Sequence, residues 1–366
     1  MSKTLQGLLI LFTSLWLAAC GGDDDGSSGS PPPTGSSDPF AAVDEAARAA
    51  YASQPIAGMG LSIYDRNGTK VFEHMYGSFS ADQRVAIASA SKLVSGVVLF
   101  RLIDQGYLSL DSTTGQVLGW TGDKANITLR QLLSFTSGLP PENRCTYRSD
   151  TSLSQCVDEI SQMDLVAPPG TRFDYGSTHL DVAGRMAEVA TGSSWNAIFA
   201  AQLRDALGMP SDLLYYANPL RPLPTDNPLL AGGLITSMNE YEHVLHFVFD
   251  KGLWQGSPLL ASGIFDTQAI APYPNAVIGH SPAPNGMRYG LTAWLECDTP
   301  ATGCATISSP GAFGFTPWLD RDTGYYAILG MEFSDNSSTH FGGMTEAQLK
   351  PLIKAAFAAG LATQAP

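Results

Sequence analysis

The pattern of apolar and polar residues predicts helices and strands at both ends of the chain. The alanine-rich stretch 41–52 places its larger apolar residues on one side, as an amphipathic helix does. Stretches 60–64 and 70–74 are strand-like, and the Arg66-Asn67-Gly68 turn between them favours a hairpin. Near the other end we expect strands at 289–296, 305–308, 314–320 and 325–331 and a closing helix at 345–359.

The middle of the chain reads mainly as helix. The apolar run 93–100 suits a buried helix that Gly106 ends. Thr128 fits the N-cap of a short helix expected to end at Gly138, and a loop with two cysteines follows. Further helices are expected at 177–191 and 194–207. The block 231–237 is expected to open another helix that runs to about residue 249. Strands at both ends and helices in the middle predict an α+β fold, in which one antiparallel sheet is closed by the terminal helices and carries a helical insertion.

Length and charge set the broad class. The chain has 366 residues, enough for one large domain or two modest ones, and 44% of them are hydrophobic, so a sizeable core is expected. The formal net charge is −14 and no cluster of lysine or arginine occurs, which argues against a nucleic-acid partner. We expect a small molecule as the partner.

The first 39 residues are expected to lie outside the fold. Residues 1–20 contain a basic residue, a short apolar run and the sequence Leu-Ala-Ala-Cys. This segment resembles a bacterial lipoprotein signal in which Cys20 is acylated; an ordinary signal peptide cut at the small residues is the alternative. Stretch 21–39 is almost free of apolar residues and is expected to be a disordered tether. We therefore expect an exported protein, lipid-anchored at the cell envelope on the periplasmic or surface side. The outer membrane is favoured because Gly21 follows the cysteine.

The other four cysteines form two close pairs in the sequence. Cys145 and Cys156 are neighbours, as are Cys297 and Cys304. An exported protein meets an oxidising compartment, where a disulfide within each close pair would leave no unpaired thiol, because Cys20 would carry the lipid. Other disulfide connectivities are possible from the sequence alone. A zinc site is less favoured because neither pair has CxxC spacing. No HExxH motif occurs, and we expect no metal and no cofactor.

The candidate chemistry begins at Ser89 and Lys92. Their spacing of three residues places the two side chains on one helix face, one turn apart. A serine hydroxyl is a poor nucleophile until a base removes its proton, and a lysine in an apolar wall can have a pKa low enough to do so. By itself the pattern also fits an exposed helix with a lysine that reaches along the surface.

Four further sequence blocks are ITLRQLLSFTSGLP from Ile127, PPGTRFDYGS from Pro168, AGGLITS from Ala231 and SPGAFG from Ser309. With Ser89-x-x-Lys92 ahead of them, this ordered set resembles the serine β-lactamase-like family. That family contains class C β-lactamases, D-Ala-D-Ala carboxypeptidases, D-aminopeptidases and esterases. The resemblance spans about residues 40–359. It implies one serine hydrolase domain at 40–362, built from an α/β subdomain with an antiparallel sheet and a helical subdomain inserted at about 100–230. The active site would lie in the cleft between the two subdomains.

The resemblance also implies roles for individual residues. Ser89 would be the nucleophile, and Lys92 and Tyr175 would share its proton. Because a neighbouring ammonium favours phenolate, we expect the pKa of Tyr175 to be lowered. The backbone N–H groups of Ser89 and Ala312 would form the oxyanion hole.

By the same resemblance, Ser177, Ser309 and Gly311 are expected to contact substrate, and the chain departs from the family pattern at the first two. Ser177 replaces the usual asparagine of the second motif. Ser309-Pro310-Gly311 stands where the family usually has Lys-Thr-Gly or His-x-Gly. In lactamases and peptidoglycan peptidases that cation or imidazole helps to hold the substrate carboxylate. Losing one hydrogen bond to a charged group costs roughly 1.5–3 kcal/mol.

We therefore expect a serine hydrolase that acts as an esterase or acyl hydrolase on neutral esters or amides. Aromatic residues near the motifs fit an ester pocket and a packed core equally well: Phe135, Phe173, Phe313, Phe315 and Trp318. The alternative is a D-Ala-D-Ala carboxypeptidase, D-amino-acid amidase or β-lactamase that acts on cell-wall-type peptides, with Arg144 or another loop cation replacing the missing lysine. A non-catalytic binding protein is disfavoured because serine, lysine and tyrosine are all present.

Overall fold

The computed structural model describes residues 38–363, except 262, 285, 332 and 334–339. The expected signal segment with Cys20 and nearly all of the expected tether lie outside the described residues. Within the described part, no helix combines the length and the apolar character needed to cross a bilayer.

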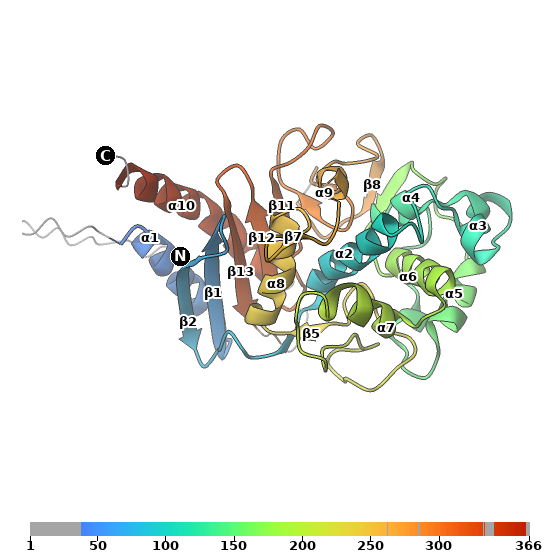
Figure 1. The fold of residues 1–366 in the computed structure, drawn as a ribbon, viewed down its shortest axis with the longest axis horizontal. Helices are drawn as coiled ribbons and strands as arrows, with labels where there is room; N and C mark the ends of the chain where they lie inside the picture. The colour runs from blue at the N-terminus through green and yellow to red at the C-terminus, as the bar shows by residue number, and fades with distance from the viewer. Residues whose placement is uncertain (1–37, 262, 285, 332, 334–339, 364–366) are drawn as a thin grey trace, which may run out of the picture. The chain divides into compact units, whose positions relative to one another are not determined.

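The two ends of the chain build one antiparallel sheet of seven strands. The strands are β1 (Gly58–Asp65), β2 (Lys70–Gly77), β9 (Arg288–Tyr289), β10 (Trp294–Leu295), β11 (Thr306–Ser308), β12 (Thr316–Asp320) and β13 (Tyr325–Met331). Their order across the sheet is β2-β1-β13-β12-β11-β10-β9 (Figure 1). β1 pairs with β2 in the predicted hairpin and, on its other side, with the last strand, so that Met59 lies opposite Met331. The predicted α+β fold with an antiparallel sheet is confirmed.

Both faces of this sheet are covered by helices. α1 (Ala41–Ala52) and α10 (Phe341–Thr363) pack on one face, and α8 (Met238–Phe249) packs on the other (Figure 1). Side chains alternate along a strand, so Leu61 and Ile63 of β1 enter the core under α1 and α10. Tyr64 of β1 points to the other face and stacks on Tyr326 with ring centroids 5.0 Å apart.

The helical part lies in the middle of the chain. Its helices are α2 (Ser91–Asp104), α3 (Thr114–Leu118), α4 (Leu129–Leu133), α5 (Leu153–Ser161), α6 (Thr178–Thr191) and α7 (Trp195–Phe199). α6 contacts each of the other five, and α2 links this part to the sheet (Figure 1). One more α-helix is α9 (Gly263–Gln268). The other strands form three short pairs: β3 (Val85–Ala86) with β5 (Ile235–Thr236), β4 (Arg172–Asp174) with β8 (Val277–His280), and β6 (Leu253–Trp254) with β7 (Ser257–Pro258).

Several elements differ from the sequence prediction. The helix expected to open at 231–237 begins only at Met238, after β5, and the helix expected at 194–207 is α7 followed by a π-helical turn. The expected strand 289–296 is split into β9 and β10, because Thr292 has a left-handed φ of 61° and makes a turn. α4 ends at Leu133 because Phe135 is left-handed, with φ 56°. α5 forms where a loop was expected, and it begins with a capping box at Ser152.

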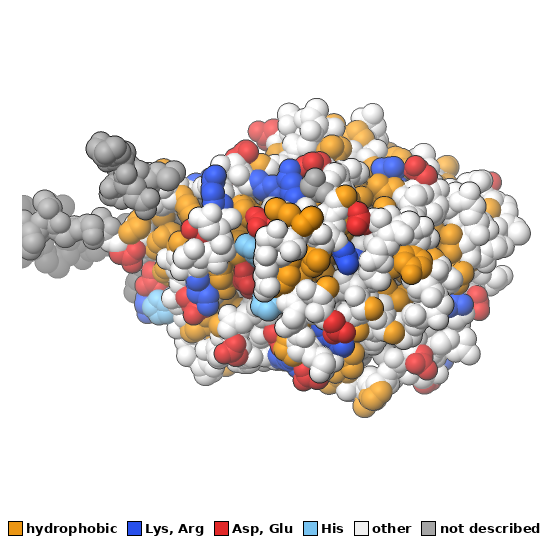
Figure 2. Space-filling model, viewed as in Figure 1, with side chains coloured by type: hydrophobic (Ala, Val, Ile, Leu, Met, Phe, Trp, Pro, Cys, Tyr) orange, Lys and Arg blue, Asp and Glu red, His pale blue; other side chains and the backbone are white. Residues whose placement is uncertain are grey.

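The surface carries both signs of charge. On the face drawn in Figure 2, acidic and basic side chains are interspersed among polar and apolar ones. This face therefore has no broad basic patch of the kind that binds nucleic acid.

Candidate active site

Ser89 lies in a tight turn between a short strand and the first helix of the helical part. β3 leads into a 3-10 turn, Ala88–Ala90, and α2 follows at once. Ala88 has a left-handed φ of 44°, a conformation that costs an L-residue roughly 1–2 kcal/mol and is concentrated at functional sites. The serine side chain stays partly exposed, whereas its neighbours on both sides are buried.

Lys92 is buried and points at the serine. Its side chain is 3% exposed, and Nζ lies 3.0 Å from Ser89 Oγ and 2.9 Å from the carbonyl oxygen of Ala231. Burial lowers the pKa of Lys92 to about 8, although the carboxyl groups of Glu142 and Asp181 act on the pKa in the opposite direction. The arrangement can hold a neutral amine beside a serine hydroxyl close to physiological pH.

Tyr175 joins this pair from the other side of the site. Lys92 Nζ lies over its ring, 4.6 Å from the centroid, and its hydroxyl hydrogen-bonds with Ser89. Burial raises the pKa of Tyr175, and the hydrogen bond with Ser89 offsets only part of the effect. The lowered phenol pKa expected from the sequence is therefore wrong. The desolvation of phenolate outweighs any attraction to the lysine, and the resting side chain is a neutral phenol.

Aromatic rings fix the phenol in place. Tyr175 stacks on Trp294 at 5.2 Å between centroids and meets Phe135 and Tyr289 edge-on at 5.4 and 5.8 Å. Its backbone N–H donates to His280 O over 2.8 Å. Rings packed on several sides leave few rotamers, so this wall orients the hydroxyl.

A buried histidine, missed by the sequence analysis, supports the same segment. His179 Nε2 lies 2.8 Å from the carbonyl oxygen of Asp174, and Nδ1 lies 2.8 Å from Ser137 Oγ. Burial lowers the pKa of His179 to about 4, so the ring is neutral; Nε2–H donates to Asp174 and Nδ1 accepts from the serine. The only signal in the sequence was a histidine four residues after Tyr175 on a helix.

The third motif packs against the strand that enters Ser89. Ser309 Oγ donates to the carbonyl oxygen of Ser89 over 3.2 Å. A Cβ on Gly311 would lie 2.1 Å from the carbonyl oxygen of Ile87, so only glycine permits this approach. Ala312 is partly exposed beside Ala88, and its N–H donates to no acceptor among the described residues.

Ser177, the last residue of the second motif, is held by a carboxylate that the sequence analysis also missed. Its N–H and Oγ donate to Glu142 Oε1 over 3.1 and 3.3 Å. Tyr147 donates to Glu142 Oε2 over 2.9 Å and lies 3.3 Å from Ser177 Oγ. The family blocks gave no signal for Glu142, because it lies just beyond the Leu139-Pro140 end of the first block.

The expected aromatic pocket is only partly present. Phe135 belongs to the wall around Tyr175, and Phe173 packs behind it. Phe315 and Trp318 are fully buried in the core, because they face the packed interiors on the two sides of the sheet. Phe313 packs on Ala86 and Ala88, beneath the serine turn.

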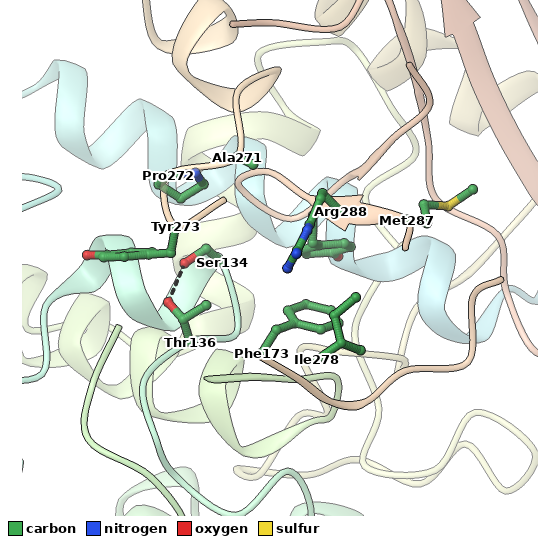
Figure 3. A pocket seen from close by; sticks show the side chains of 10 residues that line it. Ser134, Thr136, Phe173, Ala271, Pro272, Tyr273, Ile278, Met287 and Arg288 are labelled. Carbon is green, nitrogen blue, oxygen red and sulfur yellow. Dashed lines mark hydrogen bonds between the residues drawn. The ribbon is translucent and has the colours of Figure 1, made fainter. Parts of the chain in front are cut away.

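A narrow pocket lies behind the aromatic wall. In Figure 3, Phe173 and Ile278 lie on one side of it and Pro272 and Tyr273 on another, with Arg288 reaching in between. Arg288 Nη1 donates to the carbonyl oxygen of Ala276 over 2.7 Å. Because the wall separates this pocket from the serine, it is not where we place a substrate.

Both expected cysteine pairs form disulfides in the structure. Cys145–Cys156 joins the Glu142 loop to α5, and Cys297–Cys304 closes the loop between β10 and β11. Among the described residues, no group of three or more His, Cys, Asp or Glu side chains is placed to hold a metal ion.

Comparison with known proteins gives the family. The family model described as "Beta-lactamase" matches residues 43–331. Penicillin-binding protein 4 of Amycolatopsis lactamdurans is 32% identical over 139 residues, which is 36% of this chain and 36% of that protein. The match therefore spans about a third of that relative.

Solved structures show the same fold over most of the chain. A Bacteroides dorei protein described as a candidate β-lactamase is 29% identical with TM-score 0.73, and the match covers 84% of this chain and 98% of that one. EstCE1, a hydrolase with promiscuous acyltransferase activity, is 17% identical with TM-score 0.67, over 85% and 97% of the two chains. Unliganded simvastatin synthase from Aspergillus terreus is 19% identical with TM-score 0.64, over 88% and 99%. The chain belongs to the β-lactamase family, that is, to the β-lactamase-like serine hydrolases.

Proposed function

We propose that the protein is a serine esterase or related acyl hydrolase that acts on neutral small molecules, with Ser89 as nucleophile and Lys92 as base. The observation that carries the proposal is the 3.0 Å separation between Oγ and a buried Nζ. With a pKa of about 8, roughly one lysine in ten is neutral at pH 7 and free to accept a proton.

In the acylation step, the proton that Ser89 loses is later returned to the leaving group. Ser89 Oγ attacks the ester carbonyl carbon while its proton passes to the neutral amine of Lys92. The backbone N–H groups of Ser89 and Ala312 donate to the oxyanion; the Ala312 N–H is suited to this because no described residue accepts from it. When the acyl carbon–oxygen bond breaks, the leaving oxygen takes a proton from the lysine–tyrosine pair. Water then attacks the acyl-enzyme by the reverse route.

Tyr175 is the proton relay of this scheme. It is a neutral phenol at rest, and its hydroxyl can donate to the leaving oxygen and be reprotonated by the Lys92 ammonium beneath it. A phenolate base is not required, because the lysine has the lower pKa of the two.

Neutral substrates are favoured by the chemistry of the third motif. Ser309-Pro310-Gly311 contains no cation, and the Ser309 hydroxyl is engaged with the Ser89 carbonyl. A substrate carboxylate placed there would lose water without gaining a charge partner. EstCE1 and simvastatin synthase share the fold, and their descriptions as a hydrolase with acyltransferase activity and as a synthase are compatible with ester chemistry on it.

The second candidate is a carboxypeptidase, amidase or β-lactamase on cell-wall-type peptides. The 32% identity to penicillin-binding protein 4 favours it. We also propose that the protein is lipid-anchored at the cell envelope through Cys20, on the basis of the sequence alone. Labelling of cells with an azido-palmitate precursor, with Cys20→Ser as control, tests the anchor.

Purified soluble protein tests the activity directly. We expect p-nitrophenyl butyrate to be turned over faster than nitrocefin, and an acyl adduct to appear on Ser89 by mass spectrometry. Ser89→Ala should abolish the adduct, while Lys92→Ala and Tyr175→Phe should each reduce turnover by several orders of magnitude. Fast nitrocefin hydrolysis without ester cleavage would favour the second candidate, and near-normal rates in either variant would remove that residue from the proton path.

A further inference from the structure

Glu142 is a carboxylate held in a defined position beside the second motif. Both of its oxygens accept hydrogen bonds, one from the N–H and hydroxyl of Ser177 and the other from the Tyr147 hydroxyl. Ser177 is two residues from Tyr175, and the loop carrying Glu142 is tied to α5 by the disulfide at Cys145. The side chain is fixed from several directions and is still exposed to solvent.

The charge of Glu142 is not neutralised by the groups that hold it. All three donors are uncharged. Arg148, on the same loop, forms ion pairs with Asp150 and Glu159. Arg172, in the second motif, forms an ion pair with Asp174. Within the described residues, no lysine, arginine or histidine forms an ion pair with this carboxylate.

The carboxylate also lies within electrostatic reach of the reactive groups. Its charge raises the pKa of both Lys92 and Tyr175. Lys92 is buried whereas Glu142 is exposed, so of these two charges the negative one is accessible to a substrate. Oε2 accepts one hydrogen bond and can accept another, whereas Oε1 already accepts two. An ammonium group on a substrate would supply both that donor and the missing charge.

We propose that Glu142 is a specificity-determining residue that selects substrates with an ammonium group a few bonds from the scissile carbonyl. The inference rests on the proposed acyl-hydrolase function and extends its substrates beyond neutral ones: amino-acyl esters or amides are preferred over neutral acyl groups, which remain substrates, and over acyl groups bearing a carboxylate. Arg144 is exposed and lies two residues after Glu142 in the same loop. If Arg144 rather than Glu142 contacted the substrate, a carboxylate would be preferred instead of an ammonium group.

Three p-nitrophenyl esters of the same acyl length test the inference: β-alaninate, butyrate and monosuccinate. They differ only in whether the end of the acyl chain is cationic, neutral or anionic. Ser89→Ala provides the blank for spontaneous hydrolysis. We expect the kcat/KM of the wild-type protein to be about tenfold higher for β-alaninate than for butyrate, and lowest for monosuccinate. Glu142→Gln should bring the β-alaninate-to-butyrate ratio close to one.

Two variants separate charge from structure. Tyr147→Phe removes one hydrogen bond to Glu142 but keeps the charge, so it should keep the preference. Arg144→Gln should leave the ratio unchanged. Circular dichroism and thermal unfolding check that Glu142→Gln, which keeps one oxygen acceptor for Ser177, remains folded.

The outcomes are distinguishable. Turnover of all three esters without a charge preference, or a preference that survives Glu142→Gln, overturns the inference and leaves the proposed function standing. A monosuccinate preference that Arg144→Gln abolishes overturns it in favour of a carboxylate site. No turnover of any ester above the Ser89→Ala blank refutes the proposed function and this inference with it.

Discussion

The pH dependence of ester hydrolysis is the sharpest test of the proposed proton path. Burial holds the pKa of Lys92 at about 8, below the ordinary lysine value, and only the neutral amine can accept the serine proton. Below pH 8 the rate should therefore rise about tenfold per pH unit, and above it the rate should level off. Between pH 6 and pH 9 the neutral fraction grows roughly 100-fold, and kcat/KM should grow with it.

The structure also predicts how this profile moves in two variants. Glu142 raises the pKa of Lys92, so Glu142→Gln should shift the midpoint to lower pH and increase the relative rate at pH 6. Tyr175→Phe should lower the plateau rate at high pH without moving the midpoint of the pH–rate profile toward neutral pH. The reason is that the Tyr175 phenol is already protonated throughout the pH range of the assay.

The assay is the kcat/KM for p-nitrophenyl butyrate from pH 5.5 to 9.5, with Ser89→Ala subtracted at each pH as the blank. For the free enzyme this quantity reports the pKa of the essential base. A flat profile, a midpoint near the ordinary lysine value, or an upward shift in Glu142→Gln would refute the assignment of Lys92 as the base.

Three further predictions concern structure and stability. Gly311→Ala should reduce kcat/KM by about 100-fold in steady-state assays without unfolding the protein, because a Cβ 2.1 Å from Ile87 O must push the third motif away from the serine; an unchanged rate would show that the segment moves freely. Replacing Cys145 and Cys156 by serine should lower the free energy of unfolding in urea by about 2–3 kcal/mol, as for a loop closed over 11 residues; no loss would mean that the loop is already ordered without the bond. Burial raises the pKa of Asp181 well above its ordinary range, so its stability contribution is lost as pH rises. Asp181→Asn should therefore stabilise the protein at pH 8, by about 1–3 kcal/mol, more than at pH 5, and an equal effect at both values would contradict this.

Much of the fold could be predicted from the sequence because its signals are local. Apolar alternation in 60–64 identified a strand, alanine spacing in 41–52 identified a helix, and Thr128 and Gly106 marked real helix boundaries. The spacing of Ser89 and Lys92 is equally local, since one turn of chain places the two side chains on the same face. The 3.0 Å contact between their polar atoms also needs the burial that turns Lys92 toward the serine.

Tertiary structure alone decided how those residues behave. The pKa values of Lys92 and Tyr175 depend on desolvation by segments distant in the chain, so a spacing rule could place the residues and still predict the wrong direction for the phenol. Glu142 and His179 became part of the site only because a loop and a helix meet the second motif in space. Periodicity and spacing determine which local element a residue joins, whereas the charge that it carries depends on every neighbour that excludes water from it.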